Sequence, residues 1–221
     1  QKLLHMRVRP KILFATNYED AIKLINKYYL NVLGIITDVR FPIKNKKNDS
    51  AGIKLAEKIR KLDKSLPIII QSNQKIPKKI LDEYSAYFLN KNSPTLFKEL
   101  RKLLIKNFGF GDFEFTYPDG EVISKATNIE TLIKNIKNIP KESLLYHASN
   151  NHLSNWLAAR GEFKIASKFR SIKNTDFKNT EERRNHHIQL LNQLIHNKIK
   201  PAIADYSSSS LQENHHFIRI G

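Results

Sequence analysis

The sequence predicts an α/β protein in which a parallel sheet is followed by a β-hairpin and a helical region. Apolar runs at 32–36, 66–70 and 86–89, of which the first two contain several β-branched residues, have the pattern of strands buried on both faces. Amphipathic stretches of helical period separate these runs. Because strands that alternate with helices form right-handed βαβ units, the sheet is expected to be parallel.

The elements of the first half follow from local signals. A strand is expected at 11–16, and Asn17 is a helix cap with Glu19 and Asp20 in the first turn, where the helix dipole favours acidic residues. The buried strand 32–38 ends on Asp38, and the lysine-rich residues 43–50 are expected to be an exposed loop. The remaining expected elements are a helix at 52–62, a strand at 66–73, a short helix at 78–84, a strand at 86–90 and a helix at 95–107.

The second half has a different character. Alternating Phe113 and Phe115, followed by a Tyr-Pro-Asp-Gly turn signal, predict a β-hairpin at 112–124. Thr127 and Glu130 form a capping-box pair before the next helix. Three short helices are expected after Pro140, then a longer one at 180–200. Packing or surface roles are expected for Trp156 and for the histidines, which are His147, His152, His186, His187, His215 and His216.

Composition narrows the function classes. The chain has 221 residues, no cysteine and a formal net charge of +17. The absence of cysteine fits a reducing cytoplasm, and no apolar run approaches the roughly 18 residues of a membrane span. Residues 1–110 hold 23 Lys and Arg against 9 Asp and Glu. This excess leaves nucleic acid open as a partner, although dispersed lysines are also typical of a solvated surface.

Three polar residues follow the three buried strands. Asp38, Ser72 and Lys91 lie at or just beyond the carboxyl ends of their strands. Those ends meet at one edge of a parallel sheet, where ligands bind in open α/β folds. A carboxylate nucleophile, a hydroxyl and an ammonium can together accept and hold a phosphoryl group.

A strand ending in Asp with a proline four residues later, a strand ending in Ser and a last strand ending in Lys resemble the receiver domain of response regulators. The resemblance implies that Asp38 is the phospho-acceptor and that Ser72 and Lys91 contact the phosphoryl group. Receivers hold Mg²⁺ with an acidic pair after their first strand, and no such pair precedes residue 11. The residue after Lys91 is Asn92 where receivers have proline. The resemblance therefore implies a degenerate receiver with no cofactor of its own, in which Asp38 binds a metal only if an acidic pair lies upstream.

The first strand of a receiver lies in the middle of its sheet, and nothing before residue 11 resembles it. The fold class is thus a receiver-like (flavodoxin-like) sheet that lacks its first strand. Two arrangements remain open: strand 11–16 pairs directly with strand 32–38, or a strand comes from elsewhere. A lost central strand would leave unpaired edges.

The segment ESLLYHASNNHLSNWLAARGEF, the opening FGFGDF and the closing FIRIG resemble a region of large phosphotransferases similar to phosphoenolpyruvate synthase and pyruvate, phosphate dikinase. There it lies between a receiver-like domain and the ATP-grasp domain. The resemblance implies a receiver-like domain at 1–107, a connector at 108–204 and a flexible linker at 205–221. The implied partner is a downstream ATP-grasp domain of the same polypeptide, so the chain is expected to be a non-catalytic fragment. A homodimer stays open.

Two other functions are compatible with parts of the sequence. In a DNA-binding response regulator, residues 141–160 would form a helix-turn-helix, with Asn150, Asn151, Ser154 and Arg160 toward the bases. The basic charge, however, lies in the half that would not carry the reading helix. An independent enzyme is disfavoured because the sequence has no Gly-rich phosphate loop, metal cluster or nucleophile–base pair.

Overall fold

The computed structural model describes residues 10–199 and 216–220, and for residues 198, 199 and 216–220 it describes the backbone only. The described residues form two compact units. The first holds residues 10–108, 159–161 and 216–220, and the second holds 109–158 and 162–199. The two units meet in the sequence at residues 108 and 109, and residues 216–220 belong to the first unit.

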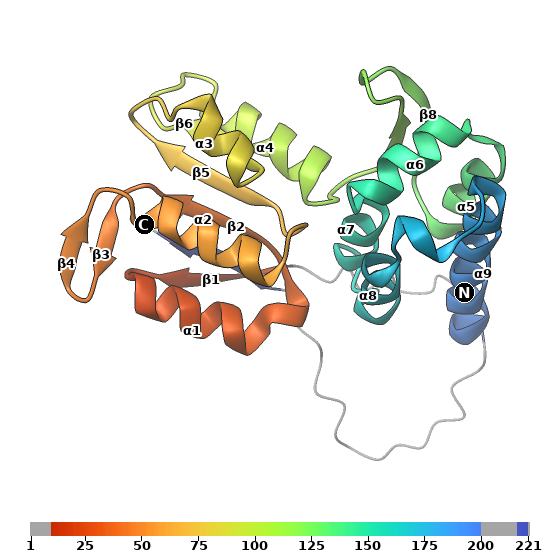
Figure 1. The fold of residues 1–221 in the computed structure, drawn as a ribbon, viewed down its shortest axis with the longest axis horizontal. Coiled ribbons are helices and arrows are strands. Elements are labelled where there is room, and N and C mark those ends of the chain that lie inside the picture. Colours follow the sequence, from red (N-terminus) through yellow and green to blue (C-terminus); the bar gives the residue numbers. More distant parts are fainter. Residues whose placement is uncertain (1–9, 200–215, 221) are drawn as a thin grey trace, which may run out of the picture. The chain divides into compact units, whose positions relative to one another are not determined.

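The first unit alternates strands and helices (Figure 1). In chain order its elements are β1 (Lys11–Ala15), α1 (Tyr18–Tyr28), the 3-10 turn η1 (Tyr29–Asn31), β2 (Val32–Asp38), β3 (Phe41–Ile43), β4 (Lys46–Asn48), α2 (Ala51–Leu62), β5 (Ile68–Ser72), α3 (Lys78–Glu83), β6 (Ala86–Asn90), α4 (Leu96–Asn107) and β9 (His216–Ile220). The cap at Asn17 is confirmed, since its Oδ1 accepts a hydrogen bond from the backbone N–H of Asp20 at 2.9 Å.

Five of these strands form one parallel sheet in the order β1-β9-β2-β5-β6. The α/β class and the parallel sheet are therefore confirmed. The strand between β1 and β2 comes from the far end of the chain: Ile218 pairs with Leu13 on one side and with Ile35 on the other. Of the two arrangements left open by the sequence, the structure has the second.

The expected linker at 205–221 is thus wrong for residues 216–220, which form β9. Its remaining residues, 205–215 and 221, lie outside the described part of the chain. The sequence run HFIRI is short and carries no periodic signal by itself. Its strand conformation is stabilised by pairing with β1 and β2, which local propensity does not reveal.

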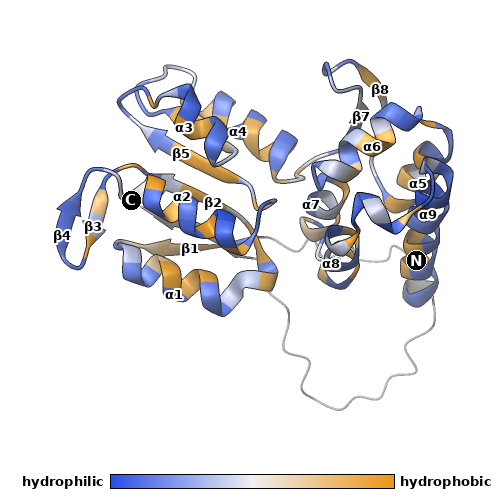
Figure 2. Ribbon diagram, in the orientation of Figure 1, coloured by the Kyte–Doolittle hydropathy of each residue, from blue (hydrophilic) through white to orange (hydrophobic). Residues whose placement is uncertain are grey.

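Helices α1, α2 and α3 pack on one face of the sheet. Their inward side chains join Leu13, Ala15, Ile35, Ile68 and Ile70 in a single buried cluster. These strand residues occupy alternate positions, as expected for one face of a pleated sheet. Figure 2 colours β5 mostly as hydrophobic, whereas α1 and α2 show both colours, as expected for helices with one buried side.

Helix α4 lies on the opposite face. A Cβ atom built on Gly34 would lie 2.1 Å from the ring of Phe108, the residue that follows α4. Gly34 neighbours Ile35 in β2 and so faces away from the first cluster. The ring of Phe108 is fully buried against this glycine. On the same face of the sheet, Ile12 and Phe14 of β1 are 55% and 67% exposed.

Residues 41–48 form a hairpin that the sequence analysis missed. Strands β3 and β4 pair antiparallel, with Phe41 opposite Asn48. The two turn residues, Lys44 and Asn45, have φ of 50° and 59°, the left-handed values that a two-residue hairpin turn requires. Because no glycine marks the turn, the segment reads in the sequence as an irregular polar loop.

The second unit begins with a hairpin and continues with helices: β7 (Phe113–Thr116), β8 (Val122–Ala126), α5 (Ile129–Asn138), α6 (Lys141–Ser149), α7 (His152–Ala158), α8 (Phe163–Ser171), the 3-10 turn η2 (Asn174–Asp176) and α9 (Thr180–Ile199). The hairpin, the three short helices and the long helix are confirmed. The capping box is one residue later than expected, because Asn128 caps α5 and Thr131 closes the box. Trp156 is a core residue, as expected: it is 1% exposed and its Nε1 donates to the carbonyl of Gly111.

Candidate functional site at the carboxyl edge of the sheet

Asp38 ends β2 and lies at the carboxyl edge of the sheet. Its side chain is 18% exposed, and Gln71 is its register partner on β5. Buried isoleucines hold both strands in the core, which fixes the backbone at this edge. The carboxylate is thus held at the position where polar groups collect in parallel sheets.

Both oxygens of the Asp38 carboxylate are engaged. Lys91 Nζ forms an ion pair with Oδ2, and Gln71 Nε2 donates a hydrogen bond to Oδ1 at 2.5 Å. Lys91 follows β6, where its backbone N–H donates to the carbonyl of Ser72 at 3.0 Å. The ammonium neutralises a carboxylate that is mostly removed from water, and this pairing compensates the cost of burying the charge.

Of the three residues predicted to meet at this edge, two are in contact. Asp38 and Lys91 form the ion pair, whereas Ser72 Oγ accepts a hydrogen bond from the backbone N–H of Gln74 at 3.0 Å. Within the described residues, Ser72 has no hydrogen bond to Asp38. The group beside Asp38 that the sequence analysis missed is the amide of Gln71. Its one sequence signal is its polarity at the end of an apolar run.

The backbone of Asp38 is held by α2. Gly52 lies in the first turn of this helix, and its N–H donates to the carbonyl of Val39 at 3.0 Å. A Cβ atom on Gly52 would lie 2.0 Å from the carbonyl oxygen of Asp38. Only glycine therefore permits this close approach of helix and strand end. The residue after Val39, Arg40, bridges the same edge by contacting Gln74 and Asp49.

The groups described in contact with the Asp38 carboxylate are hydrogen-bond donors. Lys91 and the Gln71 amide nitrogen both donate hydrogen bonds to the carboxylate, whereas Mg²⁺ requires several oxygen ligands. In the part of the chain that is described, no group of three His, Asp or Glu residues could hold a metal ion.

The helical unit contains a second group of buried polar residues. His147 is 3% exposed, and its Nε2 accepts a hydrogen bond from the backbone N–H of Thr116 at 2.8 Å. A neutral His147 therefore carries its proton on Nδ1, which lies 3.0 Å from Nδ1 of His152. Burial, and then the neighbouring His152, lower the pKa of His147 to about 3.

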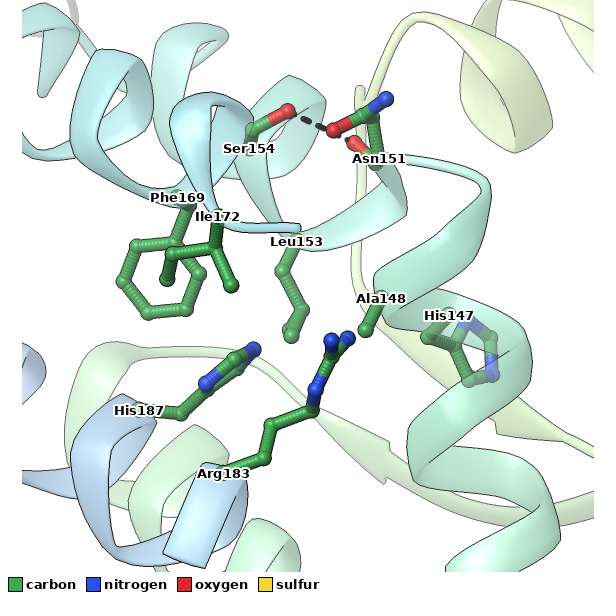
Figure 3. Close-up of a pocket in the computed structure, with 9 residues that line it drawn as sticks. All are labelled: His147, Ala148, Asn151, Leu153, Ser154, Phe169, Ile172, Arg183 and His187. Atoms are coloured by element: carbon green, nitrogen blue, oxygen red, sulfur yellow. Dashed lines mark hydrogen bonds between the residues drawn. The ribbon is translucent and has the colours of Figure 1, made fainter. Parts of the chain in front are cut away.

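His187 and Arg183 lie one helical turn apart on α9. Burial, followed by the charge of Arg183, lowers the pKa of His187 to about 4. Burial also lowers the pKa of the Arg183 guanidinium, whose Nη2 donates to Lys173 O and Asn174 Oδ1. Figure 3 shows the Arg183 guanidinium and the His187 ring pointing into a common space. That cavity measures about 10 Å³, which is room for a single water molecule.

These contacts bear out the packing role expected for His147 and His187. The ring of His186 lies 5.3 Å from that of Phe177. The side chains of His215 and His216 lie outside the description.

Comparison with known proteins gives no relative: no family model, no curated protein and no solved structure matches this chain. Among the helices of the described residues, none has the length and apolar character needed to cross a membrane.

Proposed function

We propose that this chain is a non-catalytic regulatory module, built on a receiver-like sheet with a degenerate phosphorylation site, at the N-terminal side of a phosphoenolpyruvate synthase-like phosphotransferase. The proposal of a degenerate phosphorylation site rests on the contacts of both Asp38 oxygens, one with Lys91 and the other with Gln71. The second part rests on the resemblance of residues 142–163 and of the two flanking motifs.

The strand order supports the receiver-like assignment. If β9 is counted first, the order β1-β9-β2-β5-β6 becomes 2-1-3-4-5, which is the order of flavodoxin-like sheets. Asp38 then ends the third strand, and Lys91 follows the fifth. In such sheets the first strand ends next to the third, and here Ile220 of β9 pairs with Thr37.

The contacts of Asp38 support a degenerate site. A carboxylate that attacks phosphorus uses a lone pair on one oxygen to form the new bond, and an oxygen that already accepts a strong hydrogen bond is a weaker and less accessible nucleophile. Here the ammonium holds Oδ2 and the amide of Gln71 holds Oδ1. An amide next to the acceptor carboxylate also adds no negative charge that could recruit Mg²⁺. We therefore propose that this edge of the sheet retains the shape and the charge pairing of a phosphorylation site but does not accept a phosphoryl group.

The burial of α7 argues against the DNA-binding alternative. A reading helix needs an exposed side for the bases, but residues 153–158 of α7 are all buried. The hydroxyl of Ser154, one of the four residues expected to face bases, donates to the carbonyl of Asn151 at 2.9 Å.

Phosphorylation with acetyl phosphate and Mg²⁺, followed by intact-protein mass spectrometry, tests the proposal. We expect no phosphoryl adduct on the folded chain and no turnover when ATP and pyruvate are supplied. An adduct that disappears in Asp38→Ala but persists in the control Asp49→Ala would show an active receiver and overturn the degenerate assignment. Turnover of ATP or pyruvate would overturn the non-catalytic assignment.

A further inference from the structure

The small cavity of the helical unit has a charged side chain in its wall. It measures about 10 Å³ and is lined by residues of α6, α7, α8 and α9 (Figure 3). Much of its wall is apolar, formed by Ala148, Leu153, Phe169 and Ile172. No acidic residue is among the described residues that line it, so its formal charge comes from the guanidinium of Arg183.

Most of the Arg183 guanidinium has no hydrogen-bond partner. The residue is 3% exposed, and its Nη2 donates to the carbonyl of Lys173 and to Oδ1 of Asn174, both at 2.9 Å. Within the described part of the chain, no group accepts a hydrogen bond from Nε or from Nη1. Since buried N–H groups are normally bonded, these donors are available to a small molecule or ion in the cavity.

The charge of Arg183 also lacks a direct ion pair. Burial lowers the pKa of the guanidinium, and the charge of Asp176 opposes this shift. Asp176 instead accepts a hydrogen bond from the backbone N–H of Lys173 at 2.7 Å, and no described carboxylate lies within 4.0 Å of Arg183. Because buried charges are normally paired, an anion beside the guanidinium would stabilise the folded unit.

His187 adds a second polar group to the same wall. It is 2% exposed, and its Nδ1 has no hydrogen-bond partner among the described residues. The ring and the Arg183 guanidinium point into one space (Figure 3). The ring nitrogens of His147 and the hydroxyl of Ser154, which also line the cavity, have hydrogen-bond partners elsewhere. Arg183 and His187 are therefore the groups that can hold an ion here.

We propose that this cavity binds a single chloride ion, held by the free donors of Arg183 with an N–H of His187 as a second contact. The space holds about one water molecule, which excludes polyatomic anions such as phosphate and sulfate. A water molecule would satisfy the hydrogen bonds but not the charge, so the charge selects the anion. The inference goes beyond the proposed function, because the cavity lies within the helical unit and does not involve Asp38.

Stability measured at constant ionic strength tests the proposal. The whole chain is unfolded with urea at pH 7 in sodium chloride and in sodium gluconate, whose anion is too large for the cavity. The fluorescence of Trp156 reports the transition, because this residue belongs to the same unit as the cavity. With a dissociation constant of about 10 mM, chloride at about 100 mM lowers the equilibrium constant of unfolding about tenfold.

Two valine variants separate the cavity from the protein surface. Ala148→Val fills the cavity without removing a donor, and Ser149→Val adds the same side chain at the next, exposed position of α6. We expect the chloride effect to disappear in Ala148→Val and in Arg183→Gln, and to persist in Ser149→Val. The valine pair decides the question even where Arg183→Gln does not fold. An effect of equal size in Ala148→Val would place the ion on the surface and overturn the proposal.

Chloride itself gives a second measurement. Exchange with a protein site broadens the chlorine-35 resonance, and the broadening should be smaller for Ala148→Val than for Ser149→Val. Equal broadening in the two variants, or no effect of chloride on wild-type stability, would leave a water molecule in the cavity and overturn the proposal. Neither measurement depends on the acetyl phosphate experiment, so the two proposals fail independently.

Discussion

Gln71 Nε2 lies 2.5 Å from Asp38 Oδ1, across neighbouring strands whose register places the two residues side by side. The amide occupies the one carboxylate oxygen that Lys91 leaves open. Gln71 is thus the described hydrogen-bond partner of this oxygen, and the residue can be changed without touching the ion pair.

Replacing Gln71 by alanine should free this oxygen. We expect Gln71→Ala to lower the free energy of unfolding by about 1 kcal/mol, because a partly exposed hydrogen bond to a charged group is lost. We also expect it to increase the adduct formed with acetyl phosphate, measured by mass spectrometry. Gln74→Ala is the matched control, since Gln74 contacts Arg40 instead. An unchanged, adduct-free spectrum for Gln71→Ala would mean that the amide does not limit reactivity.

Glycine at position 52 should be essential to the stability of the first unit. In Gly52→Ala the new methyl group would overlap the backbone carbonyl of Asp38, and neither the strand nor the helix can yield without losing core contacts. We expect a loss of about 2 kcal/mol or more in denaturant unfolding. Lys54→Ala, on the exposed side of the same helix, should change stability by less than about 0.5 kcal/mol. A Gly52→Ala protein as stable as this control would show that the contact relaxes freely.

Stability should fall in mild acid because of His147 and His187. Their folded pKa values are lowered to about 3 and about 4, so below the ordinary histidine pKa of about 6.5 the unfolded chain binds protons that the folded chain does not. The stabilisation is full above that pH and is lost as the pH falls through the folded pKa values, to about 4 for His187 and about 3 for His147. At pH 5 each histidine should cost about 2 kcal/mol relative to pH 7.

Urea titrations at several pH values, followed by the fluorescence of the single tryptophan, measure this loss. His187→Phe should reduce the pH dependence, because the phenyl ring has no proton to bind. His196→Gln, on the exposed part of α9, should retain the full dependence. Equal pH slopes in the wild type and His187→Phe would disprove the assignment to His187.

Strand β9 should be required for the sheet and dispensable for the helical unit. Ile218→Pro removes a backbone donor from a strand that is paired on both sides, which a central strand does not tolerate. We expect β1 and β2 amides to lose protection against hydrogen exchange, whereas amides of α5 and α9 keep theirs. Ile218→Val is the control that preserves the backbone.

The single tryptophan gives an independent measurement of the same effect. Trp156 belongs to the helical unit, so its unfolding transition should be the same in Ile218→Pro and in the control. A shift of the tryptophan transition together with loss of the sheet would instead show that the two units unfold as one.

Most helices and strands that have a recognisable pattern within their own residues were predicted from the sequence. Isoleucine-rich runs revealed β2 and β5, and helical periodicity revealed α1, α2 and α4. It did not reveal the β3–β4 turn, because Lys44 and Asn45 adopt left-handed conformations that the pattern assigns to glycine. Nor did it place β9, because pairing over such a sequence separation leaves no local trace.

The candidate site was predictable in part for the same reason. The parallel alternation of elements brought Asp38 and Lys91 to one edge, and the structure pairs them. The neighbour of Asp38 depends on the register between β2 and β5, which periodicity does not determine to one residue. Gln71 and Ser72 are adjacent in β5, so a register error of one residue exchanges them. The sequence pattern indicated Ser72 as the neighbour of Asp38, whereas the structure has Gln71 there.

The position of β9 also constrains the order of folding. The helical unit lies in the chain between β6 and β9, so the first unit to begin synthesis is the last to have all its strands. Until residues 216–220 emerge, β1 and β2 lack the strand that joins them, and the contacts of β1 with this strand span about 205 residues of sequence. Contacts of such separation form slowly. The helical unit is therefore expected to fold first. Strand β9, which follows it in the chain, then pairs with β1 and β2 and completes the sheet.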